Sequence, residues 1–241
     1  ERASINLKLK SGVKGVFNLI ATLGGGYVDK LLWDNELITT YFQRNSQLLA
    51  TYKGNNSGTD LESELRSHTD YDYSRTSTIS DIAMPATPGI NKRYYYFNQS
   101  HSATYNQVFR VGKNGELGIN AAYLNDRDER SNQSVTTTLL PDGSKNVVDE
   151  SFNGILHRNI ANGNITYMQN TERNYIKEQL KFDWLSTDGY SNIYAGEDII
   201  QENNVENYRL HNLFHLTSRT GSDKGVEFLS KINLEKKPHS L

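Results

Sequence analysis

Residues 4–27, SINLKLKSGVKGVFNLIATLGGGY, place a short alternating segment before a longer one that ends in three glycines. In the short segment Ile5, Leu7 and Leu9 alternate with polar residues, and alternate side chains of a strand point to opposite faces of a sheet. Gly12 and Gly15 flank the basic link between the two segments. The stretch therefore predicts two strands in succession.

The same alternation recurs through most of the chain. From Glu116 to Asn125 it places Leu117, Ile119, Ala121 and Tyr123 on one face and small or mixed residues on the other. We expect a mainly β, antiparallel meander. Further strands are predicted over residues 31–43, 46–53, 101–111, 164–171, 176–185, 207–217 and 225–234.

Two kinds of connection are predicted between these strands. Residues 44–45 and 112–115 have the composition of tight hairpin turns. Residues 54–92 carry no sustained strand pattern, and residues 131–152 predict a long polar hairpin that turns at residues 140–144. Short turns at one end of a sheet and long polar loops at the other are typical of outer-membrane β-barrels.

The connection over residues 54–92 contains one local helix signal. Residues 60–66, DLESELR, place acidic residues in the first turn, where they suit the helix dipole. Thr59 stands where its hydroxyl can cap that turn. We expect at most one or two short helices in the whole chain.

The composition favours a structured β-rich chain. Hydrophobic residues make up 36% of the 241 residues, below the usual ~45–50%, and the mean hydropathy is -0.68. Disordered chains usually lack aromatic residues, whereas this chain has 15 Tyr and 8 Phe. The longest apolar run, residues 16–23, is too short for a membrane helix of ~20 residues, but membrane strands need only ~9–11.

Charge and cysteine content exclude several classes of site. Lys and Arg number 26 and Asp and Glu 28, so the net charge of -2 argues against a nucleic-acid partner. The chain has no cysteine, which excludes disulfides, thiolate zinc sites and a cysteine nucleophile.

Histidines and clustered acids are the candidates for metal ligands. Only His211 and His215 lie near each other in sequence, and no third ligand follows a recognised spacing, so we interpret them as a polar pair on one strand face. Residues 126–130, DRDER, lack the spacing of a calcium loop and are interpreted as a solvated strand end. The other histidines are scattered, at His68, His101, His157 and His239.

No catalytic motif is present: the sequence lacks a Gly-x-Ser-x-Gly elbow and a phosphate-binding loop. Gly24–Gly26 lead into another alternating segment rather than a helix, which favours close packing in a strand over a phosphate cradle. Glu62 and Glu64 are interpreted as solvated loop acids. We expect no catalysis, no cofactor and no metal, and the sequence assigns no ligand-binding residue.

Residues 93–98, RYYYFN, contain four adjacent aromatic rings. In a strand, alternate rings point to opposite faces, so one core cannot hold them all. In a membrane barrel the outward pair would join the aromatic girdle and the inward pair would line the lumen.

The junction at residues 4–27 resembles the plug-to-barrel junction of TonB-dependent outer-membrane receptors of the Bacteroides type. Residues 45–56, NSQLLATYKGNN, look like the second barrel hairpin of these receptors. Residues 109–127, FRVGKNGELGINAAYLNDR, are similar to a further strand, turn and strand before a polar loop.

The resemblance implies a fragment of a transporter in the outer membrane of a Gram-negative bacterium. Residues 1–12 would end the plug domain, and residues 13–241 would form part of the wall of a β-barrel of about 22 strands. The implied partners are outer-membrane lipid, the plug, the TonB complex and an unidentified small-molecule, peptide or glycan ligand. Residues 54–92 and 131–153 would meet that ligand.

Two other readings compete with this one. A soluble or surface-exposed all-β carbohydrate-binding module is equally rich in Tyr and Asn. An enzyme would require a convergent acid pair in a cleft. A partial barrel leaves two unpaired edges, so for the barrel fragment we expect an open or irregular antiparallel sheet.

Overall fold

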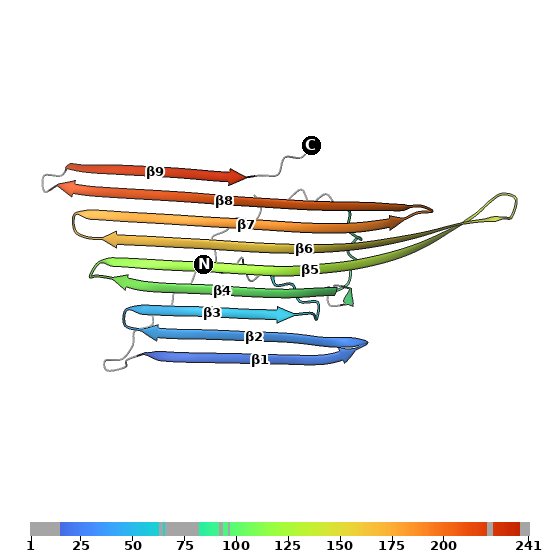
Figure 1. Ribbon diagram of the computed structural model, residues 1–241, viewed down its shortest axis with the longest axis horizontal. Coiled ribbons are helices and arrows are strands. Elements are labelled where there is room, and N and C mark those ends of the chain that lie inside the picture. Colours follow the sequence, from blue (N-terminus) through green and yellow to red (C-terminus); the bar gives the residue numbers. More distant parts are fainter. Residues whose placement is uncertain are drawn as a thin grey trace.

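The computed structural model describes residues 15–62, 65, 82–91, 94–95, 97–220 and 224–236. The alternating segments of the sequence form long strands in these residues (Figure 1). They are β1 (Val16–Val28), β2 (Lys30–Gln43), β3 (Ser46–Asn55), β4 (Phe97–Val111), β5 (Gly115–Leu139), β6 (Lys145–Asn170), β7 (Asn174–Tyr194), β8 (Asp198–Thr220) and β9 (Lys224–Lys236).

The nine strands form one sheet in the order of the sequence, and every neighbouring pair is antiparallel. Figure 1 shows this meander from β1 at one edge to β9 at the other. In the described part of the chain, β1 pairs only with β2 and β9 only with β8, so the sheet is open. The prediction of a mainly β, antiparallel meander is confirmed.

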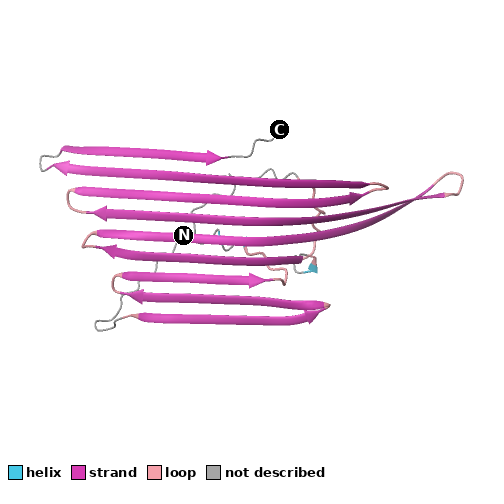
Figure 2. Cartoon of the chain, viewed as in Figure 1, coloured by secondary structure: helices cyan, strands magenta, loops and turns pink. Residues whose placement is uncertain are grey.

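The turns after β2, β4 and β6 have two or three residues and lie at one end of the sheet (Figure 2). At the other end a long connection joins β3 to β4 and residues 140–144 join β5 to β6, whereas Asp29 alone joins β1 to β2 and residues 195–197 join β7 to β8. Backbone hydrogen bonds join neighbouring turns at the short-turn end: Arg110 N donates to Asn45 O at 2.8 Å, and Asn170 N donates to Asn114 O at 3.1 Å. At the opposite end β5 and β6 continue into the predicted polar hairpin. Leu140 N donates to Ser144 O at 2.9 Å to close its turn.

The strands extend beyond the alternating segments at the end opposite the short turns. The alternation predicted residues 101–111, 116–125 and 176–185, and the polar hairpin was predicted from residue 131, whereas β4 begins at Phe97, β5 continues without a break to Leu139 and β7 ends at Tyr194. The added residues are mostly polar on both faces, so they carry no alternation of polarity.

Local predictions in the connection after β3 have mixed outcomes. Glu62 and Leu65 are helical, while residues 63, 64 and 66 of the predicted helix lie outside the described residues. The predicted cap is wrong: Asp60 Oδ1 accepts the Glu62 N–H at 2.9 Å, whereas Thr59 Oγ1 is buried and has no hydrogen-bond partner among the described residues. Residues 1–12, predicted as the end of a plug, also lie outside the described residues.

The aromatic run does not form one continuous strand. Tyr94 and Tyr95 lie in a turn, where Tyr94 N donates to Asn91 O at 3.0 Å, and β4 begins only at Phe97. The predicted alternation of rings is therefore wrong for Tyr94 and Tyr95. Residues 93 and 96 lie outside the described part of the chain.

The pairing register defines two faces of the sheet, because directly opposed residues of antiparallel strands point to the same side. We call one side the loop-bearing face; its central row is Thr104, Ala122, Asn162, Asp183 and Arg209. We call the other side the apolar face. One of its rows is Tyr52, Ala103, Tyr123, Ala161, Trp184 and Tyr208.

A small apolar core lies on the loop-bearing face. Leu61 and Leu65, from the connection after β3, cluster with side chains of three strands: Ala122 and Leu124 of β5, Ile160 of β6 and Leu185 of β7. Leu65 is fully buried and Leu124 is 1% exposed. The connection after β3 thus folds back over the sheet.

Candidate functional site

The apolar face carries large exposed hydrophobic side chains on every strand. Phe17 is 62% exposed on β1, Phe182 is 43% exposed on β7 and Leu234 is 57% exposed on β9. Exposed apolar patches of this kind mark surfaces that meet a protein or a membrane. Others on this face are Leu19, Leu37, Tyr52, Tyr105, Tyr123, Ile165, Leu180, Tyr208, Phe228 and Ile232.

Across β3 to β8 this apolar surface ends at an aromatic row, which we define as Tyr52, Tyr123, Trp184 and Tyr208. Two residues further from the short turns, the apolar face becomes polar on β4 to β8, whereas on β1 it continues with Leu23 and Tyr27, which are 82% and 77% exposed. We call that second line the polar row; its members, paired directly from strand to strand, are His101, Asn125, Asn159, Ser186 and Glu206.

Polar tips of the aromatic row bond to the polar row. The Tyr52 hydroxyl lies 2.9 Å from His101 Nδ1. Tyr123 Oη donates to Asn159 Oδ1 at 2.9 Å, and Trp184 Nε1 donates to Glu206 Oε1 at 3.1 Å. Each of these three rings therefore keeps its body over the apolar surface and directs its polar atom away from it.

Tyrosines nearer the short turns direct their hydroxyls the opposite way. Tyr41 Oη donates to Gln43 Oε1 at 3.4 Å, and Tyr167 Oη donates to Gln169 Oε1 at 3.2 Å. Tyr105 donates to Gln107 in the same Tyr-x-Gln arrangement. The polar atoms of aromatic side chains thus point outward at both ends of the apolar surface.

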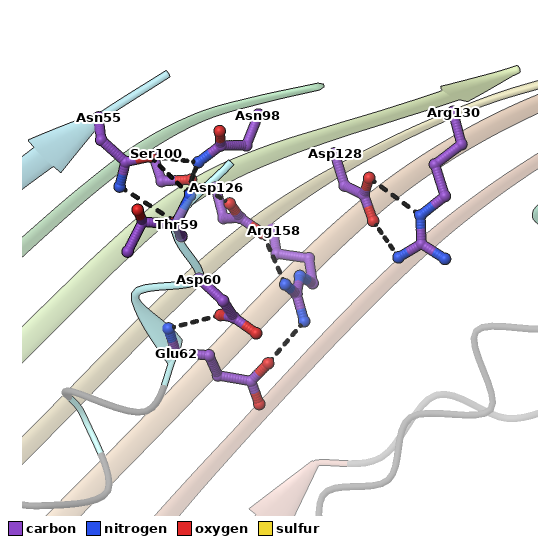
Figure 3. A network of polar contacts seen from close by, with 10 residues as sticks. All are labelled: Asn55, Thr59, Asp60, Glu62, Asn98, Ser100, Asp126, Asp128, Arg130 and Arg158. Atoms are coloured by element: carbon purple, nitrogen blue, oxygen red, sulfur yellow. Dashed lines mark hydrogen bonds and ion pairs between the residues drawn. The ribbon is translucent and has the colours of Figure 1, made fainter. Parts of the chain in front are cut away.

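The loop-bearing face is polar and holds a buried hydrogen-bond network (Figure 3). Asn98 is its centre: Nδ2 donates to Asn55 Oδ1 at 2.9 Å and to Ser100 Oγ at 2.7 Å, and Oδ1 accepts the Gly58 N–H at 2.9 Å. Asn55 and Ser100 are 1% and 0% exposed. The network therefore joins the start of the long connection to β4.

Charged residues extend the network across β5 and β6. Ser100 Oγ donates to Asp126 Oδ1 at 2.5 Å, and Arg158 Nη2 donates to Asp126 Oδ2 at 2.6 Å. Arg158 Nη1 reaches Glu62 Oε2 at 3.0 Å. We call residues 55–62, together with their hydrogen bonds and ion pairs to β4, β5 and β6, the anchor, because these contacts fix the connection to the sheet.

These positions correct two sequence interpretations. Asp126 and Asp128 are 3% and 2% exposed, so the prediction of a solvated strand end is wrong for both. Asp128 forms a two-point pair with Arg130, whose Nε lies 3.1 Å from Asp128 Oδ1. Glu62 is not a freely solvated acid either, since it pairs with Arg158.

Both members of the predicted histidine pair lie on the loop-bearing face of β8. His215 Nε2 is 2.8 Å from Glu227 Oε1, whereas His211 Nδ1 is buried and no described residue forms a hydrogen bond with it. Among the described residues, no three His, Cys, Asp or Glu side chains form a group that could hold a metal ion. His68 and His239 lie outside those residues.

Other buried polar atoms on the loop-bearing face have no hydrogen-bond partner in the part of the chain that the structure describes. They are Asn106 Nδ2, Thr187 Oγ1 and Asn207 Oδ1, from β4, β7 and β8. An unpaired buried polar group costs free energy, and a further polar molecule or segment would satisfy it. The loop-bearing face is therefore suited to polar contacts.

Gly24 is the member of the glycine run that needs its lack of a side chain. A Cβ at Gly24 would lie 3.1 Å from Asp34 O, whereas one at Gly25 would be 4.0 Å from Leu32 O. All three glycines lie in β1, which confirms the strand interpretation.

The sequence matches no protein-family model and no curated protein. Among the described helical residues, no segment is long and apolar enough to span a membrane.

Proposed function

We propose that this chain is part of the wall of an outer-membrane β-barrel, in a TonB-dependent receptor of the Bacteroides type. The observation that carries the proposal is the apolar face, where aromatic side chains turn their polar atoms outward at both ends. Such aromatic belts flank the lipid-facing band of outer-membrane barrels. In this arrangement the rings sit at headgroup level and the apolar side chains between them meet acyl chains.

The dimensions of the apolar face support the same proposal. On β7 this face extends from Ile176 to Trp184 and is apolar except for Glu178, and on β9 it extends from Val226 to Leu234 and is apolar except for Ser230. A tilted membrane strand needs about 9–11 residues to cross the hydrocarbon core. The strands continue past the aromatic row as polar hairpins, which corresponds to the extracellular side of such barrels.

The loop-bearing face would then line the lumen. It carries the buried network, the unpaired polar atoms and the connection after β3, and polar residues line the interior of these barrels. The nine strands would be part of a barrel of about 22, with residues 1–12 ending the plug and residues 13–241 in the wall.

The proposed role is uptake of a ligand rather than catalysis. Both carboxylate oxygens of the buried Asp126 accept hydrogen bonds, from Ser100 and Arg158, which suits a structural role. Outer-membrane lipid, the plug and the TonB complex are the proposed partners. The ligand would be a small molecule, a peptide or a glycan that meets the connection after β3 and the β5–β6 hairpin.

Cell fractionation of the full protein tests the proposal. We expect the protein in the outer-membrane fraction, with a gel mobility that changes on heating because a closed barrel resists detergent until it is boiled. A soluble periplasmic protein with unchanged mobility would contradict the proposal and favour the carbohydrate-binding module.

A further inference from the structure

Residues Ile82–Pro85 form a second contact between the long connection and the loop-bearing face. Ile82 is 8% exposed and Pro85 is also buried. Ala83 N donates to Gln201 Oε1 of β8 at 3.2 Å, and Ser191 Oγ of β7 donates to the same oxygen at 3.3 Å. The segment therefore lies against strands far from the anchor in sequence.

Two glycines of the wall make room for this segment. A Cβ built at Gly154 of β6 would lie 2.5 Å from Met84 Sδ and 3.1 Å from Pro85 Cδ. A Cβ at Gly189 of β7 would overlap Ile82 Cδ1. We call these two positions the glycine notches, because a side chain at Gly154 would meet Met84 and Pro85 and one at Gly189 would meet Ile82.

A third glycine shows that the close approach is local. Gly118 of β5 also lies on the loop-bearing face, but a Cβ there would be 3.8 Å from its nearest neighbour, Thr166 O. Gly118 thus tolerates a side chain that the glycine notches exclude.

The two contacts of the connection are held by different forces. The anchor uses the charged pairs of Arg158 with Glu62 and Asp126, and hydrogen bonds to charged groups are among the stronger ones. Residues 82–90, IAMPATPGI, contain no charged side chain. Their position on the sheet depends on apolar contacts, which are not directional, and on the hydrogen bond that the Ala83 N–H donates to Gln201.

We propose that residues 82–85 form a releasable strap. Shape complementarity holds the strap in the glycine notches, and the strap can leave them while the anchor stays bound. If the proposed barrel function is right, on which this role depends, release would open the lumen beside β6, β7 and β8. The strap would then regulate how far a ligand can enter along that part of the wall.

Thiol labelling in the full protein in detergent tests whether the strap opens independently. The chain has no cysteine, so Ile82→Cys and Leu61→Cys each introduce one thiol into it, at matched burial of 8% and 5%. We expect a maleimide to label Ile82→Cys at least about tenfold faster than Leu61→Cys, because local openings differ in free energy across a structure. Equal rates would show that strap and anchor open together and would overturn the proposal.

A larger residue in one glycine notch tests whether the notch holds the strap. Gly154→Val should raise the labelling rate of Ile82→Cys by about tenfold or more, because overpacking displaces the segment, and should leave Leu61→Cys unchanged. Gly118→Val is the matched control and should change neither rate. An unchanged labelling rate of Ile82→Cys in the Gly154→Val background would contradict the proposal that the Gly154 notch holds the strap.

A disulfide provides a test that does not depend on how Gly154→Val folds. Ile82 Cγ1 lies 3.2 Å from the Cβ position at Gly189, close enough for Ile82→Cys with Gly189→Cys to pair on oxidation. The bond should abolish labelling until it is reduced, and failure to form it would overturn the proposal. These readouts do not depend on membrane location or uptake. The strap proposal can therefore fail while the proposed function stands, and the proposed function can fail while the strap opens as expected.

Discussion

Glu62 of the long connection and Arg158 of β6 form an ion pair of 3.0 Å between residues 96 positions apart in sequence. Arg158 also binds Asp126 at 2.6 Å, so one guanidinium joins the connection to the sheet. Asp126 is almost completely buried, with a side chain 4% exposed, whereas the side chains of Glu62 and Arg158 are 22% and 23% exposed. Arg158 therefore stabilises the anchor mainly through its contact with the buried carboxylate of Asp126.

Arg158→Met should release the anchor by leaving the Asp126 carboxylate buried without its cation. Removing one partner of a fully buried pair costs about 3–5 kcal/mol, and the partial exposure here lowers our expectation to about 2–3 kcal/mol. Hydrogen exchange of the Glu62 amide should report this loss as faster local opening. Arg127→Met is the control, since Arg127 and its partner Glu129 are 41% and 54% exposed and should matter little.

Asn98→Asp should weaken the same anchor without changing its shape. The substitution removes the donor that serves Asn55 and Ser100 and places a second carboxylate near Asp126. We expect a loss of about 1–3 kcal/mol in local stability, measured as faster exchange of the Gly58 amide. Asn106→Asp on the same strand and face should have a smaller effect, because Asn106 Nδ2 has no partner among the described residues. Equal effects would refute the central role of Asn98.

Adjacent residues of β5 provide a test of the two faces. Ile119→Arg puts a charge on the apolar face, where a barrel strand would lose about 2–4 kcal/mol near the bilayer midplane. Asn120→Arg puts the same charge on the loop-bearing face and should be tolerated. The yield of heat-modifiable protein in the outer membrane measures both. Similar yields would contradict the assignment of faces.

Asp142 at the tip of the β5–β6 hairpin should titrate below its ordinary value of 3.8. The Ser144 hydroxyl at 2.6 Å, and then the Ser144 amide at 2.9 Å, lower the pKa of this carboxyl. Because its pKa is lowered, the ionised Asp142 carboxylate stabilises the turn at pH values above the ordinary pKa of 3.8. That contribution to stability disappears as the pH falls through the lowered pKa. The Ser144 amide shift in an NMR titration should follow this pKa, and Ser144→Ala should move it back toward 3.8.

The sequence predicts the strands well only where one face is apolar. The alternation of Leu117, Ile119, Ala121 and Tyr123 marks β5 up to the aromatic row. Beyond Leu124 both faces of the strand are mostly polar, so period-2 alternation gives no signal there. Residues 186–194 and 198–206 were missed for the same reason, although β7 and β8 pair throughout them.

The anchor could not be predicted, because it depends on register between distant strands. Asp126 and Arg158 are 32 residues apart and meet only when β5 and β6 pair as they do. Asn98 and Ser100 are ordinary polar residues in sequence, and their burial follows from the connection that covers them. Gly154 and Gly189 likewise gain a role only once Ile82–Pro85 lies against them.

Photocrosslinking at two adjacent positions of β7 tests the proposed membrane wall most directly. Phe182 points to the apolar face and Lys181 to the loop-bearing face. A photoreactive amino acid at residue 182 of the full protein, in its native membrane, should capture lipid acyl chains, and the same group at residue 181 should capture none. Absence of lipid adducts at residue 182, or equal adducts at both positions, would contradict the account.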